Sequence, residues 1–408
     1  MESSGWQCVE YFQEILEREL QLQDGIGFTV RRLQVGSATE KTAGYMSLMH
    51  RVSIDLEVGP MRQPRTLCYI VKEKSDTVFG GDLVDVLAVF PKERNVYETL
   101  LPTFEGLWSA QRVQFGPRML KATESAQFTV IVMEDLTVRG YRMRDRCFNL
   151  PMADVKGVLS KMAKFHAASA VYRAEGGNIS EHFMKGVISE NTLDLLESYY
   201  ELLFNSFLES MEKRHFPIKY LNPLTKLKGH LLSECCKLNA VDETEFNVFN
   251  HGDLWPNNIM FNESDLLFLD FQTVVYGSFA QDLLYFFVTT GAELICEAFD
   301  ELVDFYYESL TSSMKTLGYS QLLPSYAELM SQLQRRGVLV LPPLSEALGI
   351  SMAELSETLD MVQVTTDSLE GAALREKIYN NPAYVSLVDR LIPVLFEKGL
   401  FRGLDSMS

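Results

Sequence analysis

The most constraining feature of this 408-residue chain is a polar segment between residues 246 and 271. Its first part is His-Gly-Asp-Leu-Trp-Pro-Asn-Asn at 251–258, which places Asp253 five residues before Asn258. Twelve residues after Asn258, an apolar run ends in Asp270. Apolar pairs that alternate with Asn, Asp and Gly predict loops and short strands here, not a helix. A strand is therefore expected to bring Asp270 towards the loop that carries the other two residues.

These three side chains are of the types that phosphate transfer requires. That reaction needs a carboxylate to receive or orient a hydroxyl proton, and oxygen ligands for the metal that bridges the phosphates. Mg²⁺ takes hard oxygen ligands, so a carboxylate and an amide oxygen are suitable. The spacing Asp-x4-Asn, followed after one hairpin by a second Asp, is also that of kinase catalytic and metal loops. Residue types and spacing together indicate phosphoryl transfer.

The rest of the chain divides into a strand-rich first third and a mainly helical remainder. Alternating or β-branched apolar residues predict strands at 52–58, 67–71 and 128–133. Helical patterns are expected at 8–22, 82–101, 191–211 and 282–290. A further helix is predicted to open at Asp154, which would be its N-cap.

This order of elements predicts an α+β fold with two lobes. Residues 1–133 would form a small N-lobe with a first helix, an antiparallel sheet and one lobe helix. Residues 134–408 would form a larger, mainly helical C-lobe that contains the 251–270 segment. Small ligands usually bind in clefts between lobes, so we expect a nucleotide cleft near residues 133–136.

Several motifs support a more specific interpretation. In chain order they are Tyr-Ile-Val-Lys at 69–72, Met-Glu-Asp-Leu at 133–136, Leu-Ser-Lys-Met-Ala-Lys-Phe-His-Ala-Ala-Ser at 159–169, the segment 251–260, Leu-Asp-Phe-Gln at 269–272 and Gly-Ser-Phe-Ala-Gln-Asp-Leu-Leu at 277–284. Together they resemble the ecdysteroid kinase-like family, also called CHK kinase-like. That family belongs with the protein-kinase-like enzymes that include aminoglycoside and choline kinases. The resemblance covers nearly the whole chain and implies a kinase that uses ATP and Mg²⁺.

The resemblance implies a role for each residue of the catalytic segment. Asp253 would be the base or the hydroxyl-orienting residue, while Asn258 and Asp270 would hold Mg²⁺. His251 would shape the loop. Asp282 would brace the catalytic loop rather than touch the substrate.

The resemblance also implies an ATP site in the N-lobe and at the hinge. Lys72 would pair with the ATP phosphates, and Glu93 would hold Lys72 from the lobe helix. Glu98 is a rival for that task, because the helix register is uncertain by a residue or two. The hinge residues, whose backbone groups would meet adenine, are Met133, Glu134, Asp135 and Leu136.

One turn departs from the family pattern. Family members commonly carry Gly-Glu-Asn-Tyr before the second strand, whereas this chain has Thr-Ala-Gly-Tyr at 42–45. Hydroxyl and backbone N–H groups in this region could still cradle phosphate. A turn that closes less tightly would weaken substrate positioning. A nucleotide- or ligand-binding homologue without turnover is therefore an alternative to an active enzyme.

The acceptor is not encoded in any residue pattern that we recognise. The resemblance suggests a hydroxyl of an ecdysteroid or related steroid, or of a plant or xenobiotic compound conjugated for disposal. The formal charge of −18, from 37 basic and 55 acidic residues, keeps a cationic acceptor of the choline or aminoglycoside type as a second hypothesis. A protein kinase is disfavoured, because no Arg follows His251 and no Ala-Pro-Glu follows Asp270.

Composition excludes several other classes. The acidic charge argues against a nucleic-acid partner and against docking to an anionic membrane. No apolar run reaches the roughly twenty residues of a membrane span, and the N-terminus lacks a signal-peptide layout. The six cysteines form no CxxC pair, so reduced thiols are expected. The sequence thus predicts a cytoplasmic protein without an obligate protein partner.

Two further side chains lie in these motifs. His166 lies on an apolar helix face and is predicted to be a packed core histidine. Trp255 lies inside the catalytic loop, and two interpretations stay open for it. It lines the acceptor pocket, or it simply packs the loop.

Overall fold

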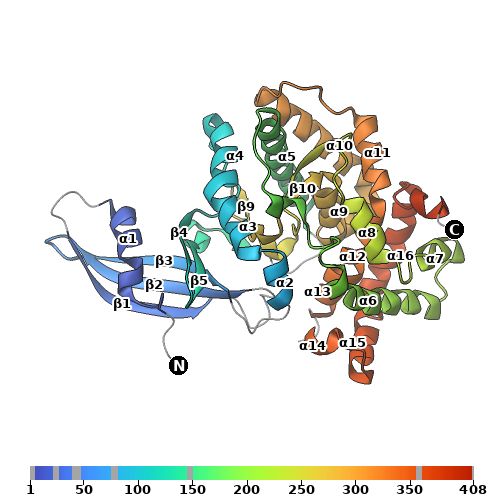
Figure 1. Ribbon diagram of the computed structural model, residues 1–408, viewed down its shortest axis with the longest axis horizontal. Coiled ribbons are helices and arrows are strands. Elements are labelled where there is room, and N and C mark those ends of the chain that lie inside the picture. Colours follow the sequence, from blue (N-terminus) through green and yellow to red (C-terminus); the bar gives the residue numbers. More distant parts are fainter. Residues whose placement is uncertain are drawn as a thin grey trace.

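The computed structural model describes residues 5–21, 27–38, 47–74, 81–144, 150–354 and 361–406. Figure 1 shows a strand-rich lobe and a helical lobe arranged along the long axis of the molecule. This arrangement confirms the predicted α+β fold with two lobes. The division between residues 133 and 134 falls inside a strand, β5 (Thr129–Glu134), and stays a prediction.

The N-lobe consists of one five-stranded sheet and its helices. Its other elements are α1 (Val9–Leu20), β1 (Phe28–Ser37), β2 (Leu48–Val58), β3 (Gln63–Glu73), α2 (Gly81–Val86), α3 (Val89–Asn95), the π-helical turn η1 (Val96–Leu100), α4 (Leu101–Leu107), η2 (Ser109–Gln111) and β4 (Met119–Glu124). The strand order is β1-β2-β3-β5-β4, and every neighbouring pair is antiparallel. Helix α1 and strands β2, β3 and β5 match the predicted segments.

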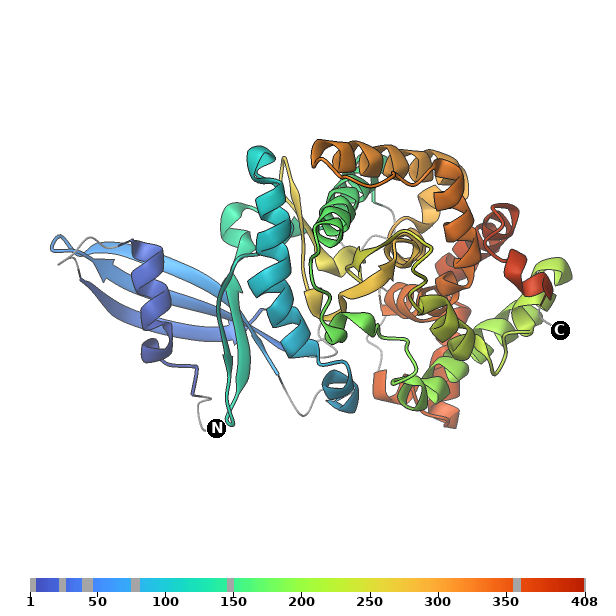
Figure 2. The same ribbon diagram turned by 45° about the horizontal axis from the view of Figure 1, so that its top comes forward.

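The two faces of this sheet pack against different partners. On one face, Phe12 and Leu16 of α1 pack with Val130 and Val132 of β5. The alternate residue Ile131 faces the opposite way and joins the main core of the molecule. Strand residues alternate between faces, so β5 connects the α1 layer to the layer that holds α3 and α4. Figure 2 shows those two helices between the sheet and the C-lobe.

The helix predicted over 82–101 is interrupted. Helix α2 ends at Val86, Ala88 has a left-handed backbone with φ of 50°, and α3 begins at Val89. Pro91 explains the break, because it lacks an N–H and is tolerated only in the first turn of a helix. Starting at Val89 places Pro91 in that turn. The helical path then continues through η1 to Leu107, beyond the predicted end.

The C-lobe is mainly helical and contains two small sheets. Its helices are η3 (Leu136–Arg139), α5 (Met152–Ala174), η4 (Glu181–Met184), α6 (Leu193–Lys213), α7 (Ile218–Thr225), α8 (Leu231–Asn239), η5 (Pro256–Asn258), η6 (Phe271–Thr273), α9 (Ala280–Thr289), α10 (Ala292–Thr316), α11 (Tyr326–Arg335), η7 (Gly337–Val340), α12 (Leu341–Pro343), the π-helical turn η8 (Leu344–Leu348), α13 (Gly349–Glu354), α14 (Met361–Val364), α15 (Leu369–Tyr379), α16 (Pro382–Glu397) and η9 (Arg402–Ser406). Its strands are β6 (Arg142–Met143), β7 (Asn247–Asn250), β8 (Ile259–Phe261), β9 (Leu266–Phe268) and β10 (Val275–Ser278). The sheets have the orders β10-β7 and β6-β8-β9. They frame the polar segment singled out in the sequence, which forms loops and short strands as predicted.

The prediction that Asp154 is an N-cap is wrong. Helix α5 begins two residues earlier, at Met152, and Pro151 is its N-cap. The apolar pattern starts only at Val155, so it conceals the first turn. Asp154 lies within that turn, where a negative charge favours the helix dipole, and it accepts a hydrogen bond from Arg144 Nε at 2.9 Å.

Two further observations concern the helices and the cysteines. Within the described ranges, we find no helix with the length and apolar character needed to cross a bilayer. The cysteines of the described part, as expected, are free: Cys8, Cys68, Cys235, Cys236 and Cys296. Cys147 and the turn at 42–45 lie outside the described residues.

Candidate functional site

Lys72 is the centre of a polar cluster between the two lobes. Its Nζ, near the end of β3, donates to Glu93 Oε2 on α3 and to Asp270 Oδ1 after β9, each at 2.6 Å. Gln272 Oε1 is a third acceptor at 2.9 Å. The side chains of Lys72 and Glu93 are 2% and 0% exposed, whereas that of Asp270 is 30% exposed. The cluster joins the lobes and leaves one carboxylate accessible to solvent.

Opposing effects set the charges of this cluster. Burial alone would lower the pKa of Lys72, but the nearby carboxylates of Asp270 and Glu93 outweigh it and raise that pKa. Burial raises the pKa of Glu93, and the ammonium of Lys72 opposes the rise. Lys72 is therefore held as a cation, the form that binds phosphate.

Of the two candidate glutamates, Glu93 makes the contact with Lys72. Glu98 lies five residues further along the helical path and is exposed. It accepts a hydrogen bond from Arg94 Nε at 2.8 Å instead. With about 3.6 residues per helical turn, a five-residue step points a side chain to a different face. This geometry excludes Glu98 as the partner of Lys72.

Asp253 lies on the loop between β7 and η5, and all its side-chain partners are neutral. Tyr285 of α9 donates its hydroxyl to Asp253 Oδ1 at 2.6 Å. Asn258 donates Nδ2 to Asp253 Oδ2 and to the Asp253 carbonyl, each at 2.9 Å. The side chain of Asp253 remains partly exposed. The two oxygens are thus oriented by hydrogen bonds and can still be reached.

The charge of Asp253 is disfavoured by its surroundings. Desolvation raises the pKa of Asp253 to about 8, and the carboxylates of Asp270 and Glu346 add to the rise. Hydrogen bonds from Tyr285 and Asn258 act in the opposite direction. A cation bound nearby would counter the repulsion between the carboxylates.

Asp282 braces the catalytic loop, as expected. Its carboxylate accepts the backbone N–H of His251 at 2.6 Å and that of Gly252 at 2.8 Å. His166 approaches it at 3.2 Å, and the other ring nitrogen of His166 contacts the Tyr306 hydroxyl at 2.7 Å. Hydrogen bonding and charge from His166 overcome burial and lower the pKa of Asp282. His166 is a fully buried core histidine, as predicted, and it supports the loop through Asp282.

Local backbone geometry fixes the loop further. Gly252 has φ of 82°, and a Cβ there would lie 2.4 Å from the carbonyl oxygen of Thr273. Only glycine fits this position. His251 Nε2 lies 2.9 Å from the carbonyl oxygen of Leu269. The histidine thereby ties the catalytic loop to the strand end that carries Asp270.

Asn258 and Asp270 offer a donor set that suits Mg²⁺. Among the described residues Asp270 bonds only through Oδ1, to Lys72, which leaves Oδ2 available. Asn258 commits its amide nitrogen to Asp253, so its amide oxygen is the atom left for a metal. The described residues contain no group of three or more His, Cys, Asp and Glu side chains that could hold an ion. Mg²⁺ bound with a nucleotide needs only one or two protein carboxylates, because phosphates and water complete its shell.

The hinge predicted at residues 133–136 connects β5 to η3. The side chain of Glu134 accepts the backbone N–H of Arg118 at 2.9 Å, and the N–H of Glu134 donates to the Arg118 carbonyl at 3.0 Å. Asp135 accepts Arg51 Nε at 2.8 Å. These side chains fix the hinge from both sides. The contact of its backbone with adenine stays a prediction.

Sequence reasoning missed some members of the site. Gln272 stands in a motif that we quoted, but we gave it no role. Tyr285 lies three residues after Asp282, and this helical spacing places both side chains on one face. The indole N–H of Trp255 is buried and has no acceptor among the described residues. Both interpretations of Trp255 stay open on this geometry.

A strand-rich lobe and a helical lobe that meet at a buried lysine–glutamate pair define the kinase-like class of proteins. The chain belongs to the Ecdysteroid kinase-like family, whose sequence model matches residues 41–319. This match confirms the resemblance seen in the motifs.

A comparison with solved structures finds three kinases named for other substrates. A choline kinase from Cryptosporidium parvum is 12% identical, with 98% of this chain and 99% of that chain covered and a TM-score of 0.48. An ethanolamine kinase from Plasmodium vivax is 12% identical, with coverage of 93% and 90% and a TM-score of 0.38. An amicoumacin kinase in complex with AMP-PNP and Ca²⁺ is 15% identical, with coverage of 90% and 93% and a TM-score of 0.41. No protein with a curated description matches the chain.

Proposed function

We propose that this protein is an ATP- and Mg²⁺-dependent phosphotransferase that phosphorylates a hydroxyl of an ecdysteroid or a similar steroid or xenobiotic alcohol. The observation that carries the proposal is that two hydrogen-bonded pairs of side chains lie in one site. Lys72 and Asp270 lie 2.6 Å apart on the side assigned to the nucleotide. Asn258 Nδ2 donates to Asp253 Oδ2 at 2.9 Å, so the proposed metal ligand Asn258 lies next to the carboxylate assigned to the acceptor. Family membership supports the same reaction class.

Each residue has a defined part in the proposed reaction. The acceptor oxygen bonds to the γ-phosphorus of ATP, the bond from that phosphorus to the ADP oxygen breaks, and Asp253 receives the hydroxyl proton. Lys72 holds the phosphates as a point charge, and Glu93 holds Lys72. Asn258 and Asp270 would hold Mg²⁺, which supplies charge neutralisation at the phosphates.

Two alternatives remain as proposals. A cationic acceptor of the choline or aminoglycoside type is favoured by the net charge of −18. A homologue that binds nucleotide or ligand without turnover is favoured by the departure from the family pattern at residues 42–45.

The test is acceptor-dependent ATP consumption by the purified protein with Mg²⁺ and a panel of steroid alcohols. Mass spectrometry should detect a product that has gained one phosphate. Asp253→Asn should lower turnover by roughly 100- to 10,000-fold, since it removes the proton acceptor. Nucleotide binding should survive in this variant, because Asp253 lies on the acceptor side.

Glu263→Gln is the matched control, because Glu263 is exposed in the turn between β8 and β9 and belongs to no pair of the site. It should leave turnover unchanged. Nucleotide binding without turnover across a broad panel would favour the non-catalytic homologue. Phosphorylation of peptides in place of small molecules would contradict the proposed acceptor class.

A further inference from the structure

A second carboxylate lies on the acceptor side of Asp253. Glu346, in the π-helical turn η8, accepts the Tyr199 hydroxyl at Oε1 (2.9 Å) and the Tyr200 hydroxyl at Oε2 (3.2 Å). Turn η8 contacts both α6, which carries the tyrosines, and α9, which carries Tyr285. On α9, the Tyr285 hydroxyl donates to Asp253 Oδ1 at 2.6 Å. Asp253 and Glu346 therefore belong to one local site.

Two tyrosines orient this carboxylate precisely enough for recognition. Tyr199 and Tyr200 are consecutive on α6, and their rings meet edge to face with centroids 5.0 Å apart. Each hydroxyl takes a different oxygen of Glu346, so the carboxylate cannot rotate freely. An ionised carboxylate has about four lone-pair sites. At least two remain for another donor, and the side chain of Glu346 is partly exposed.

In the described part of the chain, no positive side chain pairs with the carboxylates of this site. Among the residues that the structure describes, neither Glu346 nor Asp253 forms an ion pair, and their hydrogen-bond donors are tyrosines and an asparagine. Carboxylates withdrawn from water require donors or cations. The indole N–H of Trp255, two residues after Asp253, is also buried without an acceptor among the residues described.

We propose that Glu346 is a specificity-determining residue that accepts a hydrogen bond from a second donor group of the acceptor, a hydroxyl or an ammonium, while the reacting hydroxyl lies at Asp253. The same carboxylate repels anionic acceptors. The inference rests on the proposed function, since it assigns the acceptor side of that reaction. It adds the chemical requirement that the substrate carry at least one donor besides the hydroxyl that is phosphorylated.

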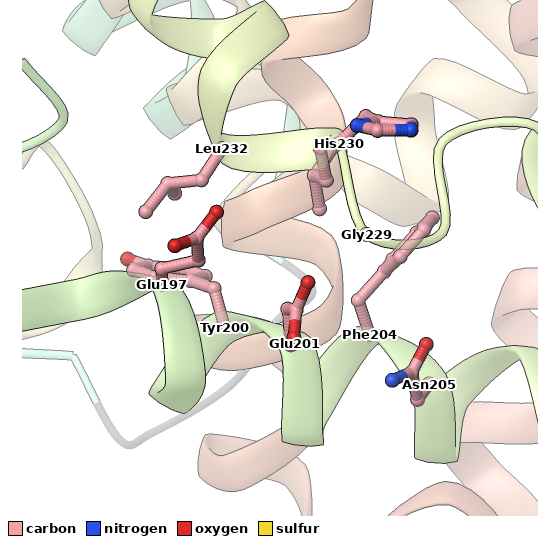
Figure 3. Close-up of a pocket in the computed structure, with 9 residues that line it drawn as sticks. Glu197, Tyr200, Glu201, Phe204, Asn205, Gly229, His230 and Leu232 are labelled. Atoms are coloured by element: carbon pink, nitrogen blue, oxygen red, sulfur yellow. The ribbon is translucent and has the colours of Figure 1, made fainter. Parts of the chain in front are cut away.

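A neighbouring pocket provides a matched control. Tyr200 also lines a small pocket between α6 and residues 229–232, and Figure 3 shows Glu197 and Glu201 beside it on the same helix. Glu201 is partly exposed, as Glu346 is, but it does not share the Tyr199 contact. Glu201→Gln removes the same charge from the same region without touching the carboxylate assigned to the acceptor.

The experiment compares Glu346→Gln with wild type, using ecdysone as a neutral polyol, ethanolamine as a cationic alcohol and glycerate as an anionic polyol. Glutamine keeps the size of Glu346 and an oxygen for the tyrosines. We expect kcat/KM for the accepted probe to fall roughly 10- to 100-fold, because a hydrogen bond to a charged group is lost. The loss should appear in the acceptor KM, with the ATP KM unchanged. Glu201→Gln should behave as wild type, and glycerate should not be phosphorylated.

Comparing the loss of kcat/KM for ecdysone with the loss for ethanolamine identifies the donor group. A larger loss with ethanolamine assigns an ammonium, and a larger loss with ecdysone assigns a hydroxyl. An unchanged acceptor KM in Glu346→Gln, or efficient use of glycerate by wild type, would overturn the inference. Tyr199→Phe, which removes one hydroxyl and keeps the ring, should show a smaller rise in the same KM. It provides the answer if Glu346→Gln does not fold.

A separate binding measurement distinguishes failure of the inference from failure of the proposed function. Isothermal titration calorimetry with ecdysone and with ethanolamine requires no turnover. If wild type consumes no ATP but binds a probe, and Glu346→Gln does not bind it, the phosphotransferase proposal fails and the role of Glu346 stands. If no probe binds to wild type, or if binding ignores Glu346, the inference is wrong.

Discussion

The two sides of the candidate site hold their carboxylates in different ways. On the side that we propose for the nucleotide, Glu93 and Asp270 share the buried cation of Lys72. On the acceptor side, Asp253 and Glu346 are held only by neutral donors within the part of the chain that the structure describes. The first group contains a cation that offsets part of its negative charge, and the second contains none among the described residues.

The difference indicates what each side needs from its ligand. A lysine shared by two carboxylates can be redirected to phosphate, while a bound metal takes over one of those carboxylates. Carboxylates held by tyrosine and asparagine are oriented but not neutralised, so they favour a ligand that donates protons or carries positive charge. We therefore propose that one side binds an anion and the other a donor.

Removing the Lys72 cation should have the largest effect on this difference between the two sides. Lys72→Met is expected to lower turnover roughly 100- to 1,000-fold, since the phosphates lose their charged partner. It should also destabilise the fold by about 3 kcal/mol, because Glu93 is left buried without a cation. Steady-state kinetics and urea unfolding measure the two effects separately.

The double variant Lys72→Met with Glu93→Gln sharpens this test. It should recover most of the lost stability, because no buried charge remains, but none of the activity. Lys74→Met, at a partly exposed lysine two residues further along, is the control and should change little. Normal turnover in Lys72→Met would contradict the assignment of the nucleotide side.

A smaller effect is expected from weakening the acceptor side. Tyr285→Phe removes the hydroxyl that orients Asp253 Oδ1 at 2.6 Å. We expect kcat to fall about tenfold, the cost of one hydrogen bond to a charged group, while the ATP KM stays constant. Tyr319→Phe removes a hydroxyl that donates to Gln321 Oε1 at 3.2 Å, outside the candidate site, and serves as the control. A rise in the ATP KM without a fall in kcat would show that Tyr285 acts on nucleotide binding and not on the acceptor side.

The two sides also differ in how far the sequence could predict them. Asp253, Asn258 and Asp270 were found because their spacing lies within one short segment. Lys72 and Glu93 were proposed through family resemblance, and the structure brings them into contact, although their catalytic roles still await the experiments above. Each of these residues stands in a motif that can be recognised along the chain.

Glu346 could not be found in this way. Its contact with Tyr199 joins residues 147 positions apart, and Glu346 stands in a π-helical turn without a sequence motif. The fold itself was predicted more completely, because apolar patterns specify strands and helices locally. The errors in the predicted fold lie at helix ends and helix breaks, as at Ala88 and Asp154. There, backbone geometry and proline override the apolar period.

Lys92 shows a third way to bury a charged group, and the sequence did not predict it. It precedes Glu93 on α3 and is only 1% exposed. Its Nζ donates to the carbonyl oxygen of Lys185 at 3.0 Å, and no carboxylate among the described residues pairs with it. Burial lowers the pKa of Lys92 from 10.5 to about 8. Unlike Lys72, this lysine is a net cost to folding when it is charged.

The sign of the pH effect follows from that pKa. Between pH 8 and 10.5 the unfolded chain binds more protons than the folded protein, so the contribution of Lys92 to stability rises with pH. Lys92→Met should therefore stabilise the protein at pH 7 by about 1–2 kcal/mol. This is the charge penalty of roughly 3 kcal/mol less about 1 kcal/mol for the lost hydrogen bond. The gain should shrink towards pH 10, because the folded lysine is then neutral and the pH approaches the unfolded-state pKa of 10.5.

Urea unfolding of wild type and Lys92→Met at pH 7, 8.5 and 10 measures this directly. Arg94→Met, an exposed change two residues further along the same helix, should differ from wild type by less than about 0.5 kcal/mol at every pH. A stability difference between wild type and Lys92→Met that does not depend on pH would show that burial does not lower the pKa of Lys92 in the folded protein. A variant less stable than wild type at pH 7 would show that the bond to Lys185 outweighs the cost of burial, so that Lys92, like Lys72, is stabilised by its partner.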